Sequence, residues 1–249
     1  MNPIGSLAWS HQNGGRLTPR ERFLFVGSAL KSALVRQWKR RVASPPVDYT
    51  RLDMEKLSFP DSKLVTEVFG LCEKAYEPWL LNHCLRAYLW GGLVGQLEGM
   101  KVDPERQLVV ALLHDLSLTR GHGGENPEDC FAVRGARLAE KLLGELGYPE
   151  LGLSAAESIA MHLNVSVSPK GPPLNYLLHQ GAAIDVVGWG SRKVRPMKDW
   201  VLQKYPRLDF KTRFRAAILQ EARGQTHTRL ALLIRFGFGQ LIQKAPYLE

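Results

Sequence analysis

The chain has 249 residues, of which 45% are hydrophobic and 23% are charged. These fractions are close to those of ordinary globular proteins, so they exclude collagen-like, disordered and disulfide-scaffold classes. A domain takes roughly 100 to 200 residues, so the chain can form one large domain or two small ones. We expect a folded protein with a core large enough for an enzyme.

The net charge of +9 is distributed unevenly along the chain. Residues 1–60 have 10 Lys and Arg against 4 Asp and Glu, residues 61–188 have 10 against 16, and residues 189–249 have 13 against 4. The basic excess therefore lies at both ends of the sequence. Because no nucleic-acid-binding motif accompanies it, a solvated basic face is favoured over a nucleic-acid partner. A non-enzymatic basic adaptor that binds an acidic partner or a membrane stays open as an alternative.

The lack of a recognisable targeting signal and the cysteine usage both favour a cytoplasmic protein. No window approaches the roughly 18 apolar residues that span a bilayer. Residues 1–15 lack the pattern of a secretory signal. The three cysteines, Cys72, Cys84 and Cys130, form no C-x-x-C pair, which suits a reducing compartment. We therefore expect no transmembrane segment, and a homo-oligomer is compatible with the sequence.

The first predicted helix lies in the basic arm. Thr18-Pro19-Arg20-Glu21 places a capping residue, a proline at the first helical position and a carboxylate three residues after the cap. A basic amphipathic helix can lie on a membrane or in a partner's groove. The short apolar stripe favours instead a helix packed on its own domain, before a break at Ser44-Pro45-Pro46. The stripe consists of Phe23, Val26, Leu30, Leu34 and Trp38.

The rest of the chain is repeatedly helical. Asp103-Pro104-Glu105 starts an almost wholly apolar helix that ends before His114, and a Gly- and Pro-rich loop follows at residues 120–127. No stretch shows sustained alternation of apolar and polar residues. We predict an all-α fold with a basic arm at residues 1–60 and one helical domain at residues 61–249. The other predicted helices cover residues 62–76, 78–100, 131–146, 154–163, 174–187, 196–204, 211–222 and 228–241.

Five ionisable residues lie on or at the end of apolar helices, where such groups are costly unless they are paired or coordinated. They are His83, His114, Asp115, His162 and Asp185. A divalent cation removes this cost, and imidazole with carboxylate suits Zn²⁺ best, with Fe²⁺ or Mn²⁺ as alternatives. Adjacent residues of a straight α-helix point about 100° apart. His114 and Asp115 can therefore share one metal only where their helix ends.

The pattern Asn82-His83, Leu112-Leu113-His114-Asp115-Leu116, His162 and Asp185 resembles the HD-domain superfamily of metal-dependent hydrolases. Residues 82–91, 111–119 and 180–188 resemble, more narrowly, its cyanamide hydratase-like branch. The resemblance spans about residues 60 to 215. It implies a helical bundle in which His83, His114, Asp115 and Asp185 hold one divalent metal ion.

The resemblance also implies an activity. The expected enzyme is a hydrolase or hydro-lyase that adds water to a small nitrile-, cyanamide- or amide-like substrate through a metal-activated water. Asp115 and His162 are then the candidates for proton transfer. Asn82, Arg86 and Thr119 are the candidates for orienting the substrate or the metal ligands.

Two local departures from the pattern of the relatives qualify this assignment. Relatives carry acidic residues in the segment at 131–136, where this chain has Arg134. Relatives often have Thr after the histidine, where this chain has Leu163. Only the reaction class is therefore carried over, and cyanamide itself is not. Cys84, next to a presumed ligand, is interpreted as a buried small residue in preference to a nucleophile.

Two other metal-dependent activities stay open. A phosphohydrolase acting on a nucleotide or phosphate ester would need cationic groups near the metal, which Arg86, Arg120 or Arg134 could supply. An oxygenase on the same scaffold would need two irons. A second metal ion would draw on His122 and His179, although neither has an aspartate at a persuasive spacing.

Overall fold

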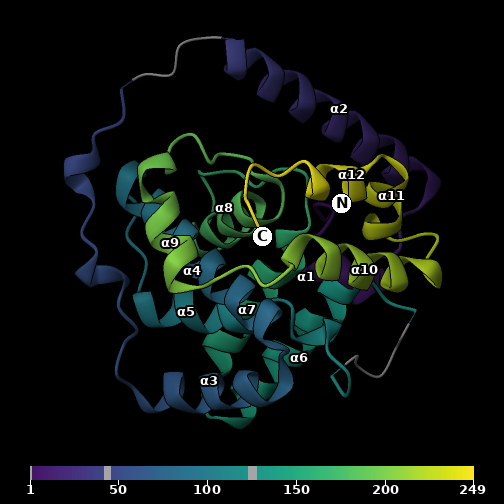
Figure 1. Ribbon diagram of the computed structural model, residues 1–249. Helices are drawn as coiled ribbons and strands as arrows, with labels where there is room; N and C mark the ends of the chain where they lie inside the picture. The colour runs from purple at the N-terminus through teal and green to yellow at the C-terminus, as the bar shows by residue number, and fades with distance from the viewer. Residues whose placement is uncertain (1, 42–45, 123–127) are drawn as a thin grey trace.

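A computed structural model of the protein describes residues 2–41, 46–122 and 128–249 (Figure 1). Within these ranges the chain forms twelve α-helices and no β-strand, which confirms the all-α prediction. Ser44, Pro45 and loop residues 123–127 lie outside the described residues. The helices are α1 (Leu7–Asn13), α2 (Pro19–Arg41), α3 (Lys63–Ala75), α4 (Pro78–Glu98), α5 (Pro104–Leu113), α6 (Phe131–Glu145), α7 (Pro149–His162), α8 (Pro173–Val187), α9 (Lys198–Lys204), α10 (Phe210–Arg223), α11 (Arg229–Arg235) and α12 (Phe238–Gln243).

The two helix starts with the strongest sequence signals form as predicted. At α2, the Thr18 backbone N–H donates to Glu21 Oε2 at 2.8 Å, and the Glu21 N–H donates back to Thr18 Oγ1 at 3.3 Å. At α5, the Glu105 N–H donates to Asp103 Oδ1 at 2.9 Å. In both cases a side chain satisfies a backbone N–H that has no partner within the helix.

Helix boundaries at the two ends of the chain differ from the prediction. α1 precedes the predicted helices, and the segment predicted as one helix at 228–241 is divided into α11 and α12. Gly237 separates them with a φ of 89°, a left-handed conformation that glycine adopts at little cost. The division turns α12 so that it packs against α8 and α10.

One large core holds the bundle together, and α4 and α8 run through it side by side (Figure 1). Glycines permit their close approach. A Cβ atom on Gly91 would lie 2.7 Å from the carbonyl oxygen of Leu177, and one on Gly181 would overlap the carbonyl oxygen of Ala87. The close approach brings His83 on α4 next to Asp185 on α8.

We expect Gly181→Ala to lower the free energy of unfolding by about 1 to 3 kcal/mol, because the added methyl group forces the two helix backbones apart. Chemical unfolding followed by circular dichroism measures this change. Gly70 lies in the middle of α3 with nothing within 4 Å of an added Cβ atom, so Gly70→Ala is the matched control. That control should gain stability, since alanine is the better helix former. Equal stability of the two variants would show that the close approach is not required.

The predicted packing of α2 on its own domain is wrong for most of its apolar stripe. Phe23, Leu30, Leu34 and Trp38 are 80%, 60%, 66% and 63% exposed. The inner face is instead the one that contains Phe25, which is buried in a small cluster with Trp9, Leu17 and Val165. Figure 1 shows α2 lying across the outside of the bundle. Among the described residues, no helix combines the length and apolar character needed to cross a membrane.

Candidate metal centre

Three of the five predicted site residues converge in the interior of the bundle. His83 comes from the first half of α4, and His114 and Asp115 follow the last residue of α5. The Nε2 atoms of His83 and His114 lie 3.5 and 3.4 Å from Asp115 Oδ2. All three side chains are buried, and their ligand atoms lie within 4.8 Å of one another. These residues therefore form a group that can hold one metal ion.

The end of α5 explains how two adjacent side chains reach one point. His114 keeps a helical backbone, with φ −64° and ψ −31°, whereas Asp115 leaves the helix with φ −110° and ψ 10°. The carbonyl oxygen of Leu112, in the last turn, accepts a hydrogen bond from the Tyr76 hydroxyl at 2.7 Å. The turn that follows allows both side chains to point the same way, as the sequence predicted.

The histidines of the site share one arrangement of their ring nitrogens. His114 Nδ1 lies 2.7 Å from the carbonyl oxygen of Ala111, and His162 Nδ1 lies 2.6 Å from that of Ile159. A carbonyl oxygen only accepts, so each Nδ1 carries the proton. The Nε2 lone pairs are thereby left for the centre of the site. This is the arrangement by which proteins orient histidine ligands toward a metal.

Buried polar atoms without hydrogen-bond partners lie within the group of His83, His114 and Asp115. His83 Nε2 and both carboxylate oxygens of Asp115 are buried and have no hydrogen-bond partner. Leaving a buried polar atom unsatisfied costs about 1 to 3 kcal/mol. Two imidazole nitrogens and a carboxylate form a ligand set suited to Zn²⁺, and also to Fe²⁺ or Mn²⁺. The residues present therefore fit a divalent metal ion.

Electrostatics keep His114, His162 and Asp115 in the forms that bind metals. Burial lowers the pKa of His114, and it lowers the pKa of His162 to about 3, so both imidazoles are neutral at physiological pH. Burial acts in the same direction on His83, but Asp115 and Asp185 outweigh it and raise its pKa. Burial opposes ionisation of Asp115, yet His114 and His83 hold the pKa of that carboxyl below its usual range.

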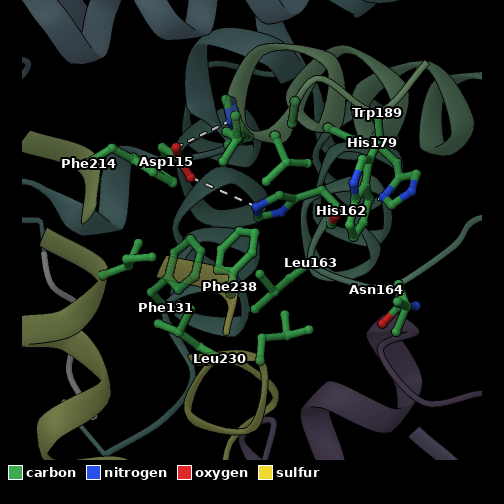
Figure 2. Close-up of a pocket in the computed structure, with 18 of the residues that line it drawn as sticks. Asp115, Phe131, His162, Leu163, Asn164, His179, Trp189, Phe214, Leu230 and Phe238 are labelled. Atoms are coloured by element: carbon green, nitrogen blue, oxygen red, sulfur yellow. Dashed lines mark hydrogen bonds and ion pairs between the residues drawn. The ribbon is translucent and has the colours of Figure 1, made fainter. Parts of the chain in front are cut away.

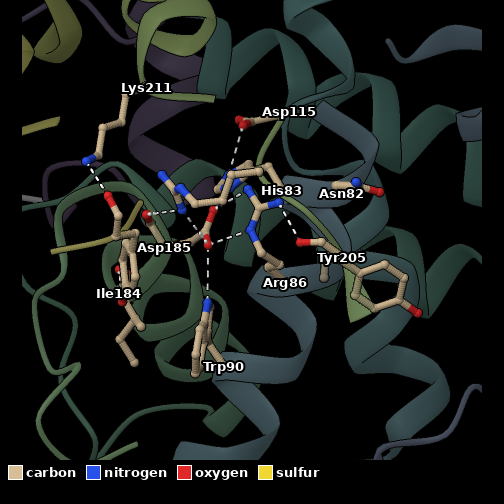
Figure 3. A network of polar contacts seen from close by, with 12 residues as sticks. Asn82, His83, Arg86, Trp90, Asp115, Ile184, Asp185, Tyr205 and Lys211 are labelled. Carbon is tan, nitrogen blue, oxygen red and sulfur yellow. Dashed lines mark hydrogen bonds and ion pairs between the residues drawn. The ribbon is translucent and has the colours of Figure 1, made fainter. Parts of the chain in front are cut away.

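Asp185, expected as a fourth ligand, lies on the Nδ1 side of the His83 ring, whereas Asp115 lies on the Nε2 side (Figure 3). Its carboxylate accepts a paired hydrogen bond from Arg86, with Nε–Oδ1 at 2.7 Å and Nη2–Oδ2 at 2.9 Å. Trp90 Nε1 and Arg207 Nη1 each donate to Oδ1 at 3.2 Å, and His83 Nδ1 lies 2.8 Å from Oδ2. Both carboxylate oxygens of Asp185 already accept hydrogen bonds, and Asp185 does not belong to the convergent group of His83, His114 and Asp115. Its position suits orienting the His83 ring.

Arg207 and Phe210 are site residues for which sequence reasoning assigned no role. Leu208 and Asp209 between them adopt left-handed backbones, with φ of 53° and 65°. The turn places Arg207 against Asp185 and stacks Phe210 on His83, with 4.7 Å between ring centroids. The only sequence signal was that both residues lie within the span of the resemblance, about residues 60 to 215.

Two candidates for orientation lie away from the metal group, in contrast to Arg86, which orders Asp185. Asn82 Nδ2 donates to the carbonyl oxygen of Pro206 at 2.8 Å and so fastens the turn that carries Arg207. Thr119 Oγ1 donates to the carbonyl oxygen of Leu116 at 2.8 Å and lines a separate cavity beside α10. Neither side chain hydrogen-bonds to the predicted ligands.

The two histidines considered for a second metal do not meet. His122 Nδ1 lies 3.1 Å from Thr119 Oγ1, whereas His179 lines the metal pocket with its Nδ1 donating to the carbonyl oxygen of His162 at 3.0 Å. Among the described residues, His83, His114 and Asp115 are the only group of three or more potential ligands that converges.

A cavity of about 70 Å³ opens at the metal group (Figure 2). Its walls are mostly apolar and include Phe131, Leu163, Val186, Trp189 and Phe238. Among the described residues that line it, none is Lys or Arg. His162 projects into it with Nε2 3.9 Å from Asp115 Oδ1. The cavity therefore suits a small uncharged molecule.

The cysteines are buried and unsuited to nucleophilic attack. Burial raises the pKa of Cys72 and Cys84 well above the usual range, and Cys130 is equally enclosed. We expect the thiol reagent DTNB to label none of the three in the native protein and all of them after denaturation. Rapid native labelling that Cys84→Ala abolishes would contradict this.

Comparison with known proteins adds no assignment: no protein-family model matches the chain, and a search of curated proteins finds no match. The assignment of this site therefore depends on its geometry.

Proposed function

We propose that the chain is a metal-dependent enzyme that adds water to a carbon–nitrogen bond of a small uncharged substrate. One observation carries the proposal: unsatisfied ligand atoms of His83 and Asp115 meet His114 Nε2 at one end of an apolar cavity. The resemblance to the cyanamide hydratase-like branch of the HD-domain superfamily supports the same reaction class.

The three convergent side chains would hold Zn²⁺, Fe²⁺ or Mn²⁺. When bound, such an ion supplies Lewis acidity that polarises water or substrate. Asp115 is ionised, so its carboxylate can also accept a hydrogen bond from an attacking water. Its Oδ1 is the oxygen that faces His162.

His162 is placed for proton transfer. Its Nδ1 proton is held by the carbonyl oxygen of Ile159, so Nε2 is free to accept a proton inside the cavity. Burial lowers its pKa to about 3, so the ring is neutral at rest. Its position in the cavity, with Nε2 3.9 Å from Asp115 Oδ1, suits it to passing a proton to a substrate nitrogen.

The cavity supports a carbon–nitrogen substrate over a phosphate ester. A phosphate would need cationic groups at the metal. Arg86 is committed to Asp185, Arg120 lines the separate cavity, and Arg134 forms a 2.7 Å ion pair with Glu221. The apolar walls instead lower the cost of holding an uncharged substrate and exclude bulk water.

Metal analysis and a substrate panel test the proposal. We expect about one transition-metal ion per chain, turnover of a nitrile, cyanamide or amide, and no release of phosphate from nucleotides or phosphate esters. His162→Asn should retain the metal and lose roughly 100-fold to 10,000-fold in turnover. Purified protein without stoichiometric metal, or activity on phosphate esters alone, would overturn it.

A further inference from the structure

The outer face of α2 presents apolar side chains to solvent. Phe23, Leu30, Leu34 and Trp38 recur at helical spacing and lie within one stripe, and each is more than half exposed. Single exposed apolar residues need no explanation, but a contiguous stripe of large ones marks an interaction surface. The stripe therefore requires a partner.

The bundle cannot cover this stripe, because the opposite face of α2 is already anchored. Phe25 is buried against Val165, and the guanidinium carbon of Arg36 lies 3.6 Å from the ring centroid of Trp189. Phe25 and Arg36 are eleven residues apart, close to three full helical turns, so they lie on one face. The outer stripe is thus held away from the body.

The charge of α2 identifies the partner. Glu21 is its only acidic residue, and this side chain is buried, with Trp9 Nε1 donating to Oε1 at 2.6 Å. Two copies packed through this face would bring like charges together, whereas an anionic bilayer matches both the apolar stripe and the positive charge. The cationic residues are Arg20, Arg22, Lys31, Arg36, Lys39, Arg40 and Arg41.

We propose that α2 binds in the plane of an anionic membrane surface through its outer face. The stripe would enter the boundary between headgroups and acyl chains, and Arg20 and Lys31 would meet the lipid phosphates. Val165 and Trp189, which the inner face of α2 contacts, also line the cavity. Binding would therefore place α2 between the lipid and that wall of the cavity. The proposal does not depend on the reaction of the metal centre.

Vesicle sedimentation of the full chain tests it. Wild-type protein should bind mixed phosphatidylcholine–phosphatidylserine vesicles, bind phosphatidylcholine alone more weakly, and lose affinity with added salt. Leu34→Glu should weaken binding about tenfold or more. Leu153→Glu, at a position on α7 that is 52% exposed, is the matched control and should bind as wild type does. Circular dichroism verifies that both variants are folded.

Three results would overturn the proposal. One is no binding to either vesicle, and another is equal binding by Leu34→Glu and wild type. The third is a wild-type dimer, seen by light scattering, that Leu34→Glu dissociates, while the protein does not bind vesicles. A second copy of the chain would then cover the stripe.

Discussion

Asp115→Ala is expected to abolish metal binding and turnover together. Asp115 supplies the only carboxylate among the convergent ligands, and its two oxygens have no other hydrogen-bond partner. Without it, two imidazoles remain, fewer protein ligands than Zn²⁺ usually has. We expect metal content to fall from about one ion per chain to less than about a tenth, as elemental analysis after dialysis would show.

Thermal unfolding gives an independent measure of the same prediction. A metal that binds only the folded chain raises its stability, so chelation should lower the Tm of wild type and leave that of Asp115→Ala unchanged. Asp199→Ala, at an exposed position on α9, is the control and should behave as wild type does. Stoichiometric metal in Asp115→Ala would refute the assigned centre.

The sequence was sufficient where local chemistry decides the structure. Proline and aspartate at the start of α5, and an apolar run that stops at Leu113, indicated that the helix ends at the His114-Asp115 pair. The environment of His83 on an apolar helix likewise marked it as a group in need of a partner. These features depend on a few neighbouring residues, so sequence reasoning can reach them.

The sequence was insufficient where distant segments choose their partners. Asp185 was expected at the metal because its apolar surroundings demand compensation, but Arg86 and Arg207 supply the charge. Arg207 reaches it through two left-handed residues that no local pattern announced. For α2, periodicity identified an apolar stripe, whereas the contacts of Phe25 determined which face is buried. Both outcomes depend on tertiary packing.

Asp185→Asn should separate the role of orienting a ligand from that of being one. The change removes the charge that Arg86 and Arg207 share, and both guanidinium groups are almost fully buried. Breaking a buried ion pair costs about 3 to 5 kcal/mol, which we expect as the loss in free energy of unfolding. Metal affinity should fall about 10-fold to 100-fold, because the His83 ring loses its orienting carboxylate while all three ligands remain.

Urea unfolding and metal titration of the folded protein measure these two effects. Arg213→Ala breaks the exposed ion pair with Glu77 and is the control, with an expected change below about 1 kcal/mol. If Asp185→Asn stays folded and yet loses metal as completely as Asp115→Ala, Asp185 is itself a ligand and the carboxylate must leave Arg86 to reach the ion. If instead stability falls and binding is only weakened, the two arginines use Asp185 to hold His83 in place for the metal.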